Sequence, residues 1–255
     1  MAWAGRIPIM LRSHDPAKGT ALVSTLPLTH AATTSSAAIR WFLLRRLHSL
    51  TGILFGGYLM VHLLVNATMI EGQHPHDVFA DQVNKIHSLP FLLAIEWTFI
   101  YLPLIFHSVY GIWITFAGRP NVFDYPYGKN VYYTLQRISA MIILGFVLFH
   151  VLGMKGWFGD TLTFQYGPGQ AAASTARHIN AHWMITWVVY PLGVLASCFH
   201  LANGFWTAAI SWGLTVSAKA QQRWGWVCAG IFLFSFGCGM TAWMAAMQLK
   251  GMPVP

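Results

Sequence analysis

Charged residues are scarce in this chain of 255 residues: they make up 9% of it, and only seven are Asp or Glu. Soluble domains carry about 25% charged residues, so the composition excludes an ordinary soluble globular protein. Hydrophobic residues account for 56% of the sequence, and the mean hydropathy is +0.52. The composition therefore predicts an integral membrane protein.

Cysteine is also rare, and its pattern excludes several kinds of site. The three cysteines, Cys198, Cys228 and Cys238, lie in apolar segments and none belongs to a C-x-x-C motif. This argues against a disulfide framework, a zinc site and a covalently attached c-type haem; we interpret the three as small packing residues. The apolar segments contain one acidic residue, Glu96, whereas proton relays use chains of Asp and Glu in the membrane.

Five apolar segments are long enough to cross a bilayer, which takes roughly 20 helical residues. They cover about residues 41–69, 90–118, 132–157, 181–215 and 224–248. They predict an all-α membrane domain of five helices over residues 40–250. Pro103 and Pro191 fall inside spans, where neighbouring groups can satisfy the freed carbonyls. Residues 1–39 are rich in Ser, Thr and Ala and lack a signal-peptide apolar run, so we expect a flexible cytoplasmic extension there.

Lysine and arginine are distributed unequally between the two sides of these spans. Eleven flank one side: Arg6, Arg12, Lys18, Arg40, Arg45, Arg46, Arg119, Lys129, Arg137, Lys219 and Arg223. Four flank the other: Lys85, Lys155, Arg177 and Lys250. Under the positive-inside rule, this asymmetry predicts a cytoplasmic N-terminus and a C-terminus outside.

Four of the twelve histidines fall deep inside four different predicted helices: His62, His107, His150 and His200. An ionisable side chain inside the membrane is costly and is therefore a functional hypothesis by default. Counted from the span ends, His62 and His150 lie in the outer half of the membrane, and the other two lie in the inner half.

The remaining histidines have simpler interpretations. Six lie outside the spans and are interpreted as solvated loop residues: His14, His30, His74, His76, His87 and His178. His48 and His182 lie near span ends, where an interfacial position or a polar contact accounts for them.

The four deep histidines also share local sequence in pairs. The first and third helices contain GYLMVH (57–62) and GFVLFH (145–150), and the second and fourth contain FHSVYGIW (106–113) and FHLANGFW (199–206). In the second pair, Gly111 and Gly204 follow the histidine by four residues, so they share its helix face and leave a flat space for a planar macrocycle.

This pattern favours two non-covalent haems, each held by two imidazoles from facing helices. Zinc and copper sites gather three or four ligands around one centre, which fits less well. The plain alternative is that each histidine is a core residue bonded to a backbone carbonyl.

Seven stretches resemble, in order, the cytochrome b subunit of succinate:quinone oxidoreductases, in the form with one membrane polypeptide and two haems b. They are RRLHSLTG (45–52), VHLLVN (61–66), NKIHSLPF (84–91), LPLIFHSVYGIW (102–113), LQRISA (135–140), LFHV (148–151) and FHLANGFWTAAISWGLTV (199–216). The resemblance covers about residues 40–245 and all five predicted spans.

The resemblance implies roles for individual residues. In that family the histidines of these motifs are the axial ligands, which implies His62 and His150 for an outer haem. It implies His107 and His200 for an inner haem. It also implies that groups at the cytoplasmic helix ends approach the inner haem's propionates: Arg45, His48, Ser49 and Arg137.

The resemblance further implies an anchor and electron-transfer subunit of succinate dehydrogenase in a bacterial cytoplasmic membrane. The chain has no flavin or iron–sulfur motif, so a flavoprotein with FAD and an iron–sulfur subunit are expected on its cytoplasmic face. Electrons would pass through two haems b to a membrane quinone, with menaquinone the favoured acceptor. Fumarate-reducing relatives can carry a glutamate two residues before the fourth-helix ligand; Cys198 stands there, which favours succinate oxidation.

Alternatives remain open from the residues alone. The polar candidates for a quinone site are unranked: Asn66, Glu71, His87 and Glu96. The chain could anchor another di-haem quinone-linked oxidoreductase, such as a nitrate reductase or formate dehydrogenase, or be a haem-free transporter or scaffold. Transporters commonly show inverted repeats, whereas the like motifs here occur in helices that run the same way.

Overall fold

The computed structural model describes residues 28–71, 78–118, 122–159, 167 and 170–251, with side chains from residue 36 onward. These residues form helices and no β-strand. The elements are α1 (Leu28–Ala67), the 3-10 turn η1 (Thr68–Glu71), α2 (Val78–His87), α3 (Leu92–Glu96), the π-helical segment η2 (Trp97–Tyr101), α4 (Leu102–Ala117), α5 (Gly128–Met154), α6 (Ala171–Ile179), the π-helical segment η4 (Ile185–Val189), α7 (Tyr190–Ser211) and α8 (Ala218–Gln248).

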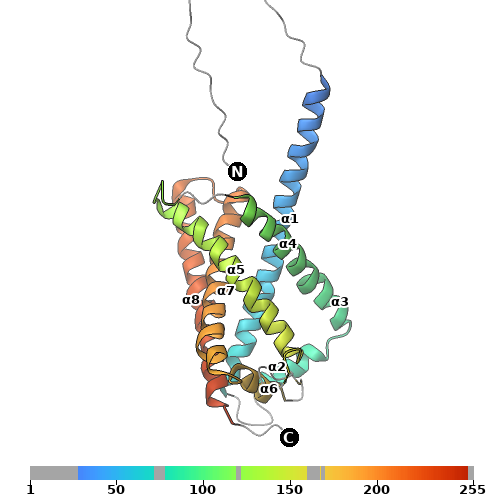
Figure 1. Cartoon of the computed structure of the whole chain (residues 1–255), viewed down its shortest axis with the longest axis vertical. Helices are drawn as coiled ribbons and strands as arrows, with labels where there is room; N and C mark the ends of the chain where they lie inside the picture. Colours follow the sequence, from blue (N-terminus) through green and yellow to red (C-terminus); the bar gives the residue numbers. More distant parts are fainter. Residues whose placement is uncertain (1–27, 72–77, 119–121, 160–166, 168–169, 252–255) are drawn as a thin grey trace, which may run out of the picture.

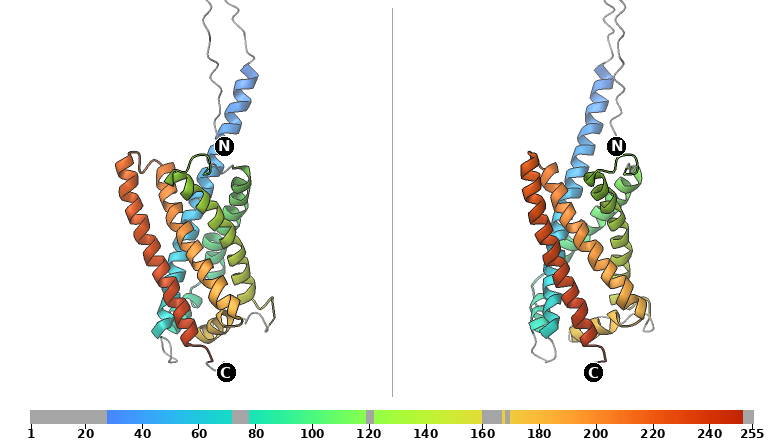
Figure 2. Two further views of the ribbon diagram at one scale, coloured as in Figure 1. Left: turned by 60° about the vertical axis from the view of Figure 1, so that its left-hand side comes forward. Right: turned by 90° about the vertical axis from the view of Figure 1, so that its left-hand side faces the viewer.

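Five segments are long and apolar enough to cross a membrane, which confirms the predicted number and order of spans. Their bounds are Ser36–Glu71, Leu92–Ala117, Gly128–Met154, Ile185–Ser211 and Ala218–Gln248. The amino-terminal end of α1 projects beyond the bundle (Figures 1 and 2). Because α1 begins at Leu28, residues 28–39 of the predicted extension are helical, and the boundary expected at residue 39 falls within a helix. Residues 1–27 lie outside the described residues.

Each long helix packs closely against some of its neighbours but not against others. α1 packs against α4 and α8, while α7 packs against α5 and α8 (Figures 1 and 2). Gly193 permits the close approach of α7 to α5, because a Cβ there would collide with the Phe146 ring. Among the described elements, neither α1 with α5 nor α4 with α7 is a closely packed pair. These two separated pairs are the helices that carry the four deep histidines.

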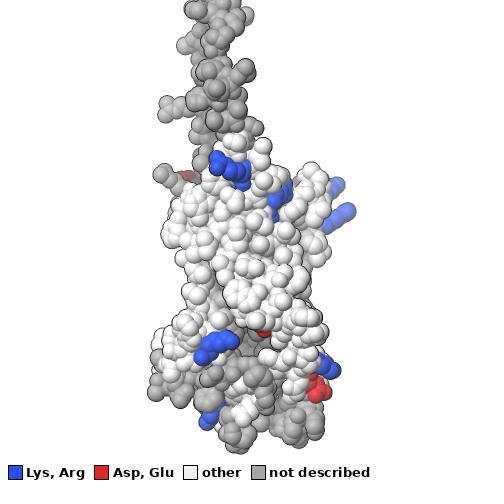
Figure 3. Space-filling view, turned by 90° about the vertical axis from the view of Figure 1, so that its right-hand side faces the viewer, with Lys and Arg blue, Asp and Glu red and all other residues white. Residues whose placement is uncertain are grey.

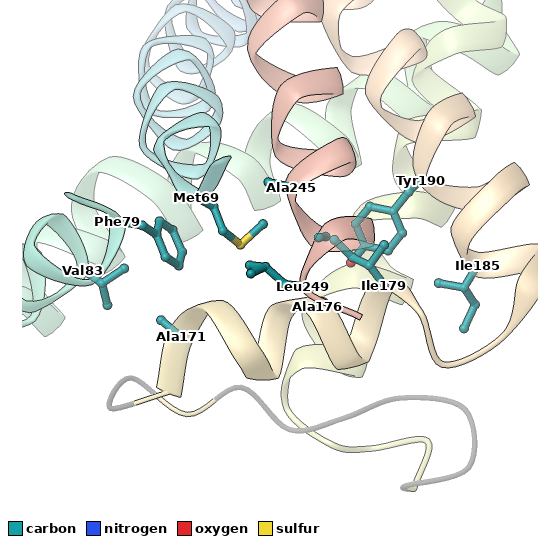
Figure 4. Close-up of a cluster of buried hydrophobic side chains, with 11 residues drawn as sticks. Met69, Phe79, Val83, Ala171, Ala176, Ile179, Ile185, Tyr190, Ala245 and Leu249 are labelled. Carbon is teal, nitrogen blue, oxygen red and sulfur yellow. The ribbon is translucent and has the colours of Figure 1, made fainter. Parts of the chain in front are cut away.

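One end of the bundle is covered by the short helices α2 and α6, and we call it the α6 end. Figure 4 shows α6 crossing this end, with Met69, Phe79 and Leu249 meeting in one apolar layer beside it. All three side chains are buried, so this layer is shielded from solvent. Burial of apolar area at about 25 cal/mol per Å² is what holds such short helices in place.

Lysine and arginine concentrate at the opposite end, which we call the basic end. Its described members are Arg40, Arg45, Arg46, Lys129, Arg137, Lys219 and Arg223; those at the α6 end are Lys85, Lys155, Arg177 and Lys250. On the face drawn in Figure 3, the middle of the molecule carries no Lys or Arg. The apolar belt between two charged ends is the pattern expected of a multi-pass membrane protein.

The two prolines predicted inside spans each follow a π-helical segment. Pro103 and Pro191 occupy the first turn of α4 and α7, directly after η2 and η4. The Leu102 and Tyr190 N–H groups donate to carbonyls five residues back, at Trp97 and Ile185. Proline has no N–H to donate and its ring clashes with a carbonyl one turn back, and a local π adjustment of this kind accommodates it within a membrane helix.

Candidate functional site: two histidine pairs

The structure brings the four deep histidines together as two pairs at different depths. At the α6 end, the ring centroids of His62 on α1 and His150 on α5 lie 6.0 Å apart, with planes at 76°. Nearer the basic end, the centroids of His107 on α4 and His200 on α7 lie 6.2 Å apart, with planes at 88°. Each pair bridges two helices that do not pack closely against each other.

The spacing within each pair fits two imidazoles on opposite faces of one metal. Imidazole nitrogens bind first-row metals at about 2.0–2.1 Å, and the ring centre lies roughly 1 Å behind the nitrogen, so two such ligands have centroids about 6 Å apart. The separations of 6.0 and 6.2 Å between the ring centroids match this value. Among the described residues there is no group of three or more His, Cys, Asp or Glu around one centre, so each pair stands by itself.

The Nδ1 atom of each histidine has a partner within the protein. His150 Nδ1 lies 3.0 Å from the Tyr190 hydroxyl, and His62 Nδ1 lies 3.5 Å from that of Tyr58. A ligand histidine uses its second nitrogen in this way to fix the orientation of its ring. Among the described residues, no hydrogen bond engages Nε2 of either histidine, so Nε2 is the nitrogen that each ring has left for a metal.

The pair nearer the basic end is oriented mainly by backbone carbonyls. His107 Nδ1 lies 3.0 Å from the His48 carbonyl oxygen. His200 Nδ1 lies 3.2 Å from both the Gln136 carbonyl oxygen and the Ser139 hydroxyl. Carbonyl oxygens only accept, so Nδ1 of His107 and His200 donates and Nε2 carries the free lone pair. Sequence reasoning missed these partners because they depend on how the helices are rotated.

Two predicted groups at the basic end have buried polar atoms without a partner. His48 Nδ1 and Arg137 Nε lack a hydrogen bond, as does the hydroxyl of Tyr110. The His48 ring stacks on His107 at 4.0 Å and lies 5.5 Å from the Tyr110 ring. Buried polar groups are almost always satisfied, so the neighbouring His48 and Tyr110 rings mark a place where an additional hydrogen-bonding partner, such as a carboxylate, would fit. Tyr110 was not among the sequence candidates.

The other candidates of the predicted propionate set have different surroundings. Arg45 is exposed, and the Ser49 hydroxyl accepts a 2.9 Å hydrogen bond from Trp212 Nε1. The Arg137 guanidinium lies 3.6 Å from the centre of the Tyr133 ring. Arg46, which follows Arg45 and was not a candidate, donates to the Ser211 carbonyl oxygen.

The glycines near the histidines differ in what surrounds them. A Cβ on Gly111 would lie 3.3 Å from His48 Cε1, and one on Gly204 would lie 3.7 Å from Gln136 Nε2. The tightest approach involves Gly52, a glycine the sequence analysis did not single out. A Cβ there would lie 2.6 Å from His107 Cε1, so Gly52 is required for the His107 ring to lie against α1.

The prediction that His178 is a solvated loop residue was wrong. His178 lies on α6 with 0% of its surface exposed, because α6 turns this face toward α5 and α7. Burial lowers the pKa of His178 to about 4, so the ring is neutral. The signal that could have found it is the apolar face of the segment 171–179, which is too short to read as a span. His87 and His182 are exposed, as expected; His14, His30, His74 and His76 lie outside the described residues or their side chains.

The unranked polar candidates also lie toward the α6 end. Asn66 Nδ2 donates a 2.7 Å hydrogen bond to the His62 carbonyl oxygen. Glu71 and His87 are exposed, and Glu96 is half-buried at the end of α3. Cys198, which stands where some relatives carry glutamate, is fully buried and packs with Leu63 and Val194, in agreement with its interpretation as a packing residue.

Comparison with known proteins identifies a cytochrome with a similar sequence. The chain is 35% identical over 204 residues to the succinate dehydrogenase cytochrome b558 subunit of Bacillus subtilis (strain 168). The alignment covers 80% of this chain and 96% of the relative. No protein-family model matches the sequence. The five apolar helices, the two histidine pairs and this identity over nearly the whole relative lead to one conclusion: the chain belongs to the family of succinate dehydrogenase cytochrome b subunits, the membrane anchors of that oxidoreductase.

Proposed function

We propose that this subunit carries electrons from partner subunits at its basic end, through two haems b, to a quinone in the membrane. The observation that carries the proposal is the presence of two histidine pairs at two depths, with centroid separations of 6.0 and 6.2 Å. When bound, haem iron supplies one-electron redox chemistry that the side chains alone lack. Menaquinone is the proposed acceptor, and succinate is the proposed electron donor of the complex.

The residues of this chain have distinct parts in the proposal. His62 and His150 hold the haem at the α6 end, and His107 and His200 hold the one nearer the basic end. The carbonyl acceptors at Nδ1 of His107 and His200 leave Nε2 of both rings unprotonated and available to the metal. The Tyr58 and Tyr190 hydroxyls orient the other two rings. Near the basic end, His48, Arg137 and the exposed Arg45 face the propionates, with Ser49 engaged by Trp212.

The basic end is the proposed docking face for a flavoprotein with FAD and an iron–sulfur subunit. Seven of the eleven described Lys and Arg residues lie at this end, and four lie at the other. By the positive-inside rule, we propose that this end faces the cytoplasm of a bacterial cell. The quinone site is proposed at the α6 end, where Asn66, Glu71, His87 and Glu96 are the polar groups in reach.

The proposal is tested by a reduced-minus-oxidised spectrum and a pyridine haemochrome count on the purified complex. We expect two b-type haems per chain, with one lost in His62→Ala and the other in His200→Ala. His182→Ala is the matched control, because His182 is exposed and should leave both haems in place. The rate of succinate oxidation coupled to menaquinone reduction should fall when either haem is lost.

Other outcomes would replace the proposal with a defined alternative. A single haem in the unmodified complex would remove one of the two histidine pairs from it. A colourless complex would leave a haem-free scaffold or transporter. Co-purification with nitrate reductase or formate dehydrogenase subunits would assign the chain to another di-haem anchor.

A further inference from the structure

His178 is a fully buried histidine whose two ring nitrogens have no hydrogen-bond partner in the protein. None of its surface is exposed, and both Nδ1 and Nε2 are unsatisfied. An unsatisfied buried polar group costs about 1–3 kcal/mol, so native proteins rarely keep one without a ligand. Of the six unsatisfied buried atoms in the described residues, two belong to this ring.

The ring lies directly beside the histidine pair at the α6 end. Its centroid is 6.4 Å from that of His150 and 5.8 Å from that of Tyr190, and both neighbours meet it edge-on. Tyr190 is the residue that holds His150 Nδ1. The centroid of the Phe149 ring lies 5.6 Å from that of His178. His178 is therefore an unsatisfied polar side chain in contact with both His150 and the residue that orients it.

The enclosure of His178 favours a resident group over a diffusible one. A quinone enters from the lipid and needs an open path to its hydrogen-bond donors, whereas no surface of His178 is accessible. A cofactor enclosed during assembly needs no such path. The preceding residue, Arg177, is exposed, in contrast to His178.

The chemistry of the missing partner follows from a comparison with the other site. Near the basic end, unsatisfied nitrogen and hydroxyl atoms belong to His48, which stacks on His107, and to Tyr110 and Arg137. At the α6 end, the corresponding unsatisfied atoms are those of His178 alone. A haem b carries carboxylates, and a carboxylate in a low-dielectric interior requires hydrogen-bond donors. A neutral imidazole offers one N–H donor.

We propose that the His178 ring donates a hydrogen bond to a propionate carboxylate of the haem held by His62 and His150. The proposal rests on the proposed function, because it requires a haem at the α6 end. His178 acts here as a positioning residue that fixes one edge of the cofactor and offsets part of its negative charge. It forms no bond to the metal.

The test is a potentiometric titration of both haems, with resonance Raman detection of the propionate bending modes, on the purified complex. His178→Phe removes the donor at similar volume, and His178→Gln retains an N–H donor. His182→Phe is the matched control at the same end. The unmodified complex is measured first. If it holds no haem at the α6 end, the proposed function is wrong, and this result does not depend on any His178 variant.

We expect His178→Phe to move the α6-end haem about three- to tenfold toward its oxidised form, because the unpaired carboxylate stabilises ferric iron; tenfold corresponds to 59 mV for one electron. Its propionate mode should shift, and the other haem should keep its potential. His178→Gln should restore most of both signals, and His182→Phe should change neither. If His178→Phe loses the α6-end haem, its retention in His178→Gln supports the donor role.

Three results would overturn the proposal. One is an unchanged potential and propionate mode in His178→Phe. Another is a raised KM for a menaquinone analogue with both haem signals unchanged, which would assign the nitrogen to the quinone. The third is loss of the α6-end haem from both His178→Phe and His178→Gln, which would make the ring a packing element.

Discussion

Gly52 is the residue that allows His107 to lie against α1. A Cβ at this position would lie 2.6 Å from Cε1 and 2.9 Å from Nδ1 of His107, and Nδ1 is the atom bonded to the His48 carbonyl oxygen. We expect Gly52→Ala to displace the ring, break this bond and lose or perturb the spectrum of one b-type haem only. Overpacking of this kind costs about 1–3 kcal/mol, so the thermal stability of the complex should also fall.

Gly230→Ala is the matched control for Gly52→Ala. Gly230 lies on α8, exposed, with nothing within 4 Å of a Cβ. There the better helix propensity of alanine should stabilise by up to about 1 kcal/mol, with both haem signals unchanged. An unaltered haem spectrum in Gly52→Ala would show that His107 does not need this position.

The pairing of the histidines was predictable at the residue scale, and their hydrogen-bond partners were not. Depth in a membrane helix follows from counting residues at 1.5 Å each, which places His62 with His150 and His107 with His200. The partners Ser139 and Tyr190 depend on the rotation of α5 and α7 about their axes. Nothing in the count of residues along a span fixes that rotation.

At the scale of elements, the five spans were predictable because length and hydropathy decide them, whereas α6 and the π segments were not. A nine-residue helix such as α6 is too short for an apolar period to be told from a loop. Its position comes from tertiary contacts with α2, α5 and α8. The π segments η2 and η4 likewise show only as prolines that lie inside an apolar run.

Asn180 is the polar link that holds the end of α6 to the bundle. Its Nδ2 donates 2.8 Å hydrogen bonds to the Ala176 and Ala246 carbonyl oxygens, the second of them on α8. We expect Asn180→Ala to loosen α6, because a lost hydrogen bond that leaves a carbonyl unsatisfied costs about 1–3 kcal/mol. Hydrogen–deuterium exchange of the α6 amides should accelerate about tenfold.

Asn130→Ala serves as the control for this exchange measurement. Asn130→Ala removes a comparable bond, from Asn130 Nδ2 to the Tyr125 carbonyl oxygen at 2.9 Å, at the exposed start of α5. It should leave exchange in α6 unchanged. Equal acceleration in both variants would indicate general destabilisation rather than release of α6.

At the scale of the whole molecule, the two ends differ in charge, and the difference predicts which end faces the cytoplasm. Lys219 lies at the basic end and Lys250 at the α6 end, and both are exposed. Because cytoplasmic flanks carry the excess of Lys and Arg, we expect Lys250→Cys to react with a membrane-impermeant maleimide in intact cells. Lys219→Cys should react only after permeabilisation. The unmodified chain gives the background, since Cys198 and Cys228 are buried and Cys238 lies within α8. The reverse labelling would invert the membrane orientation, and with it the assignment of the basic end as the face that receives electrons from the partner subunits.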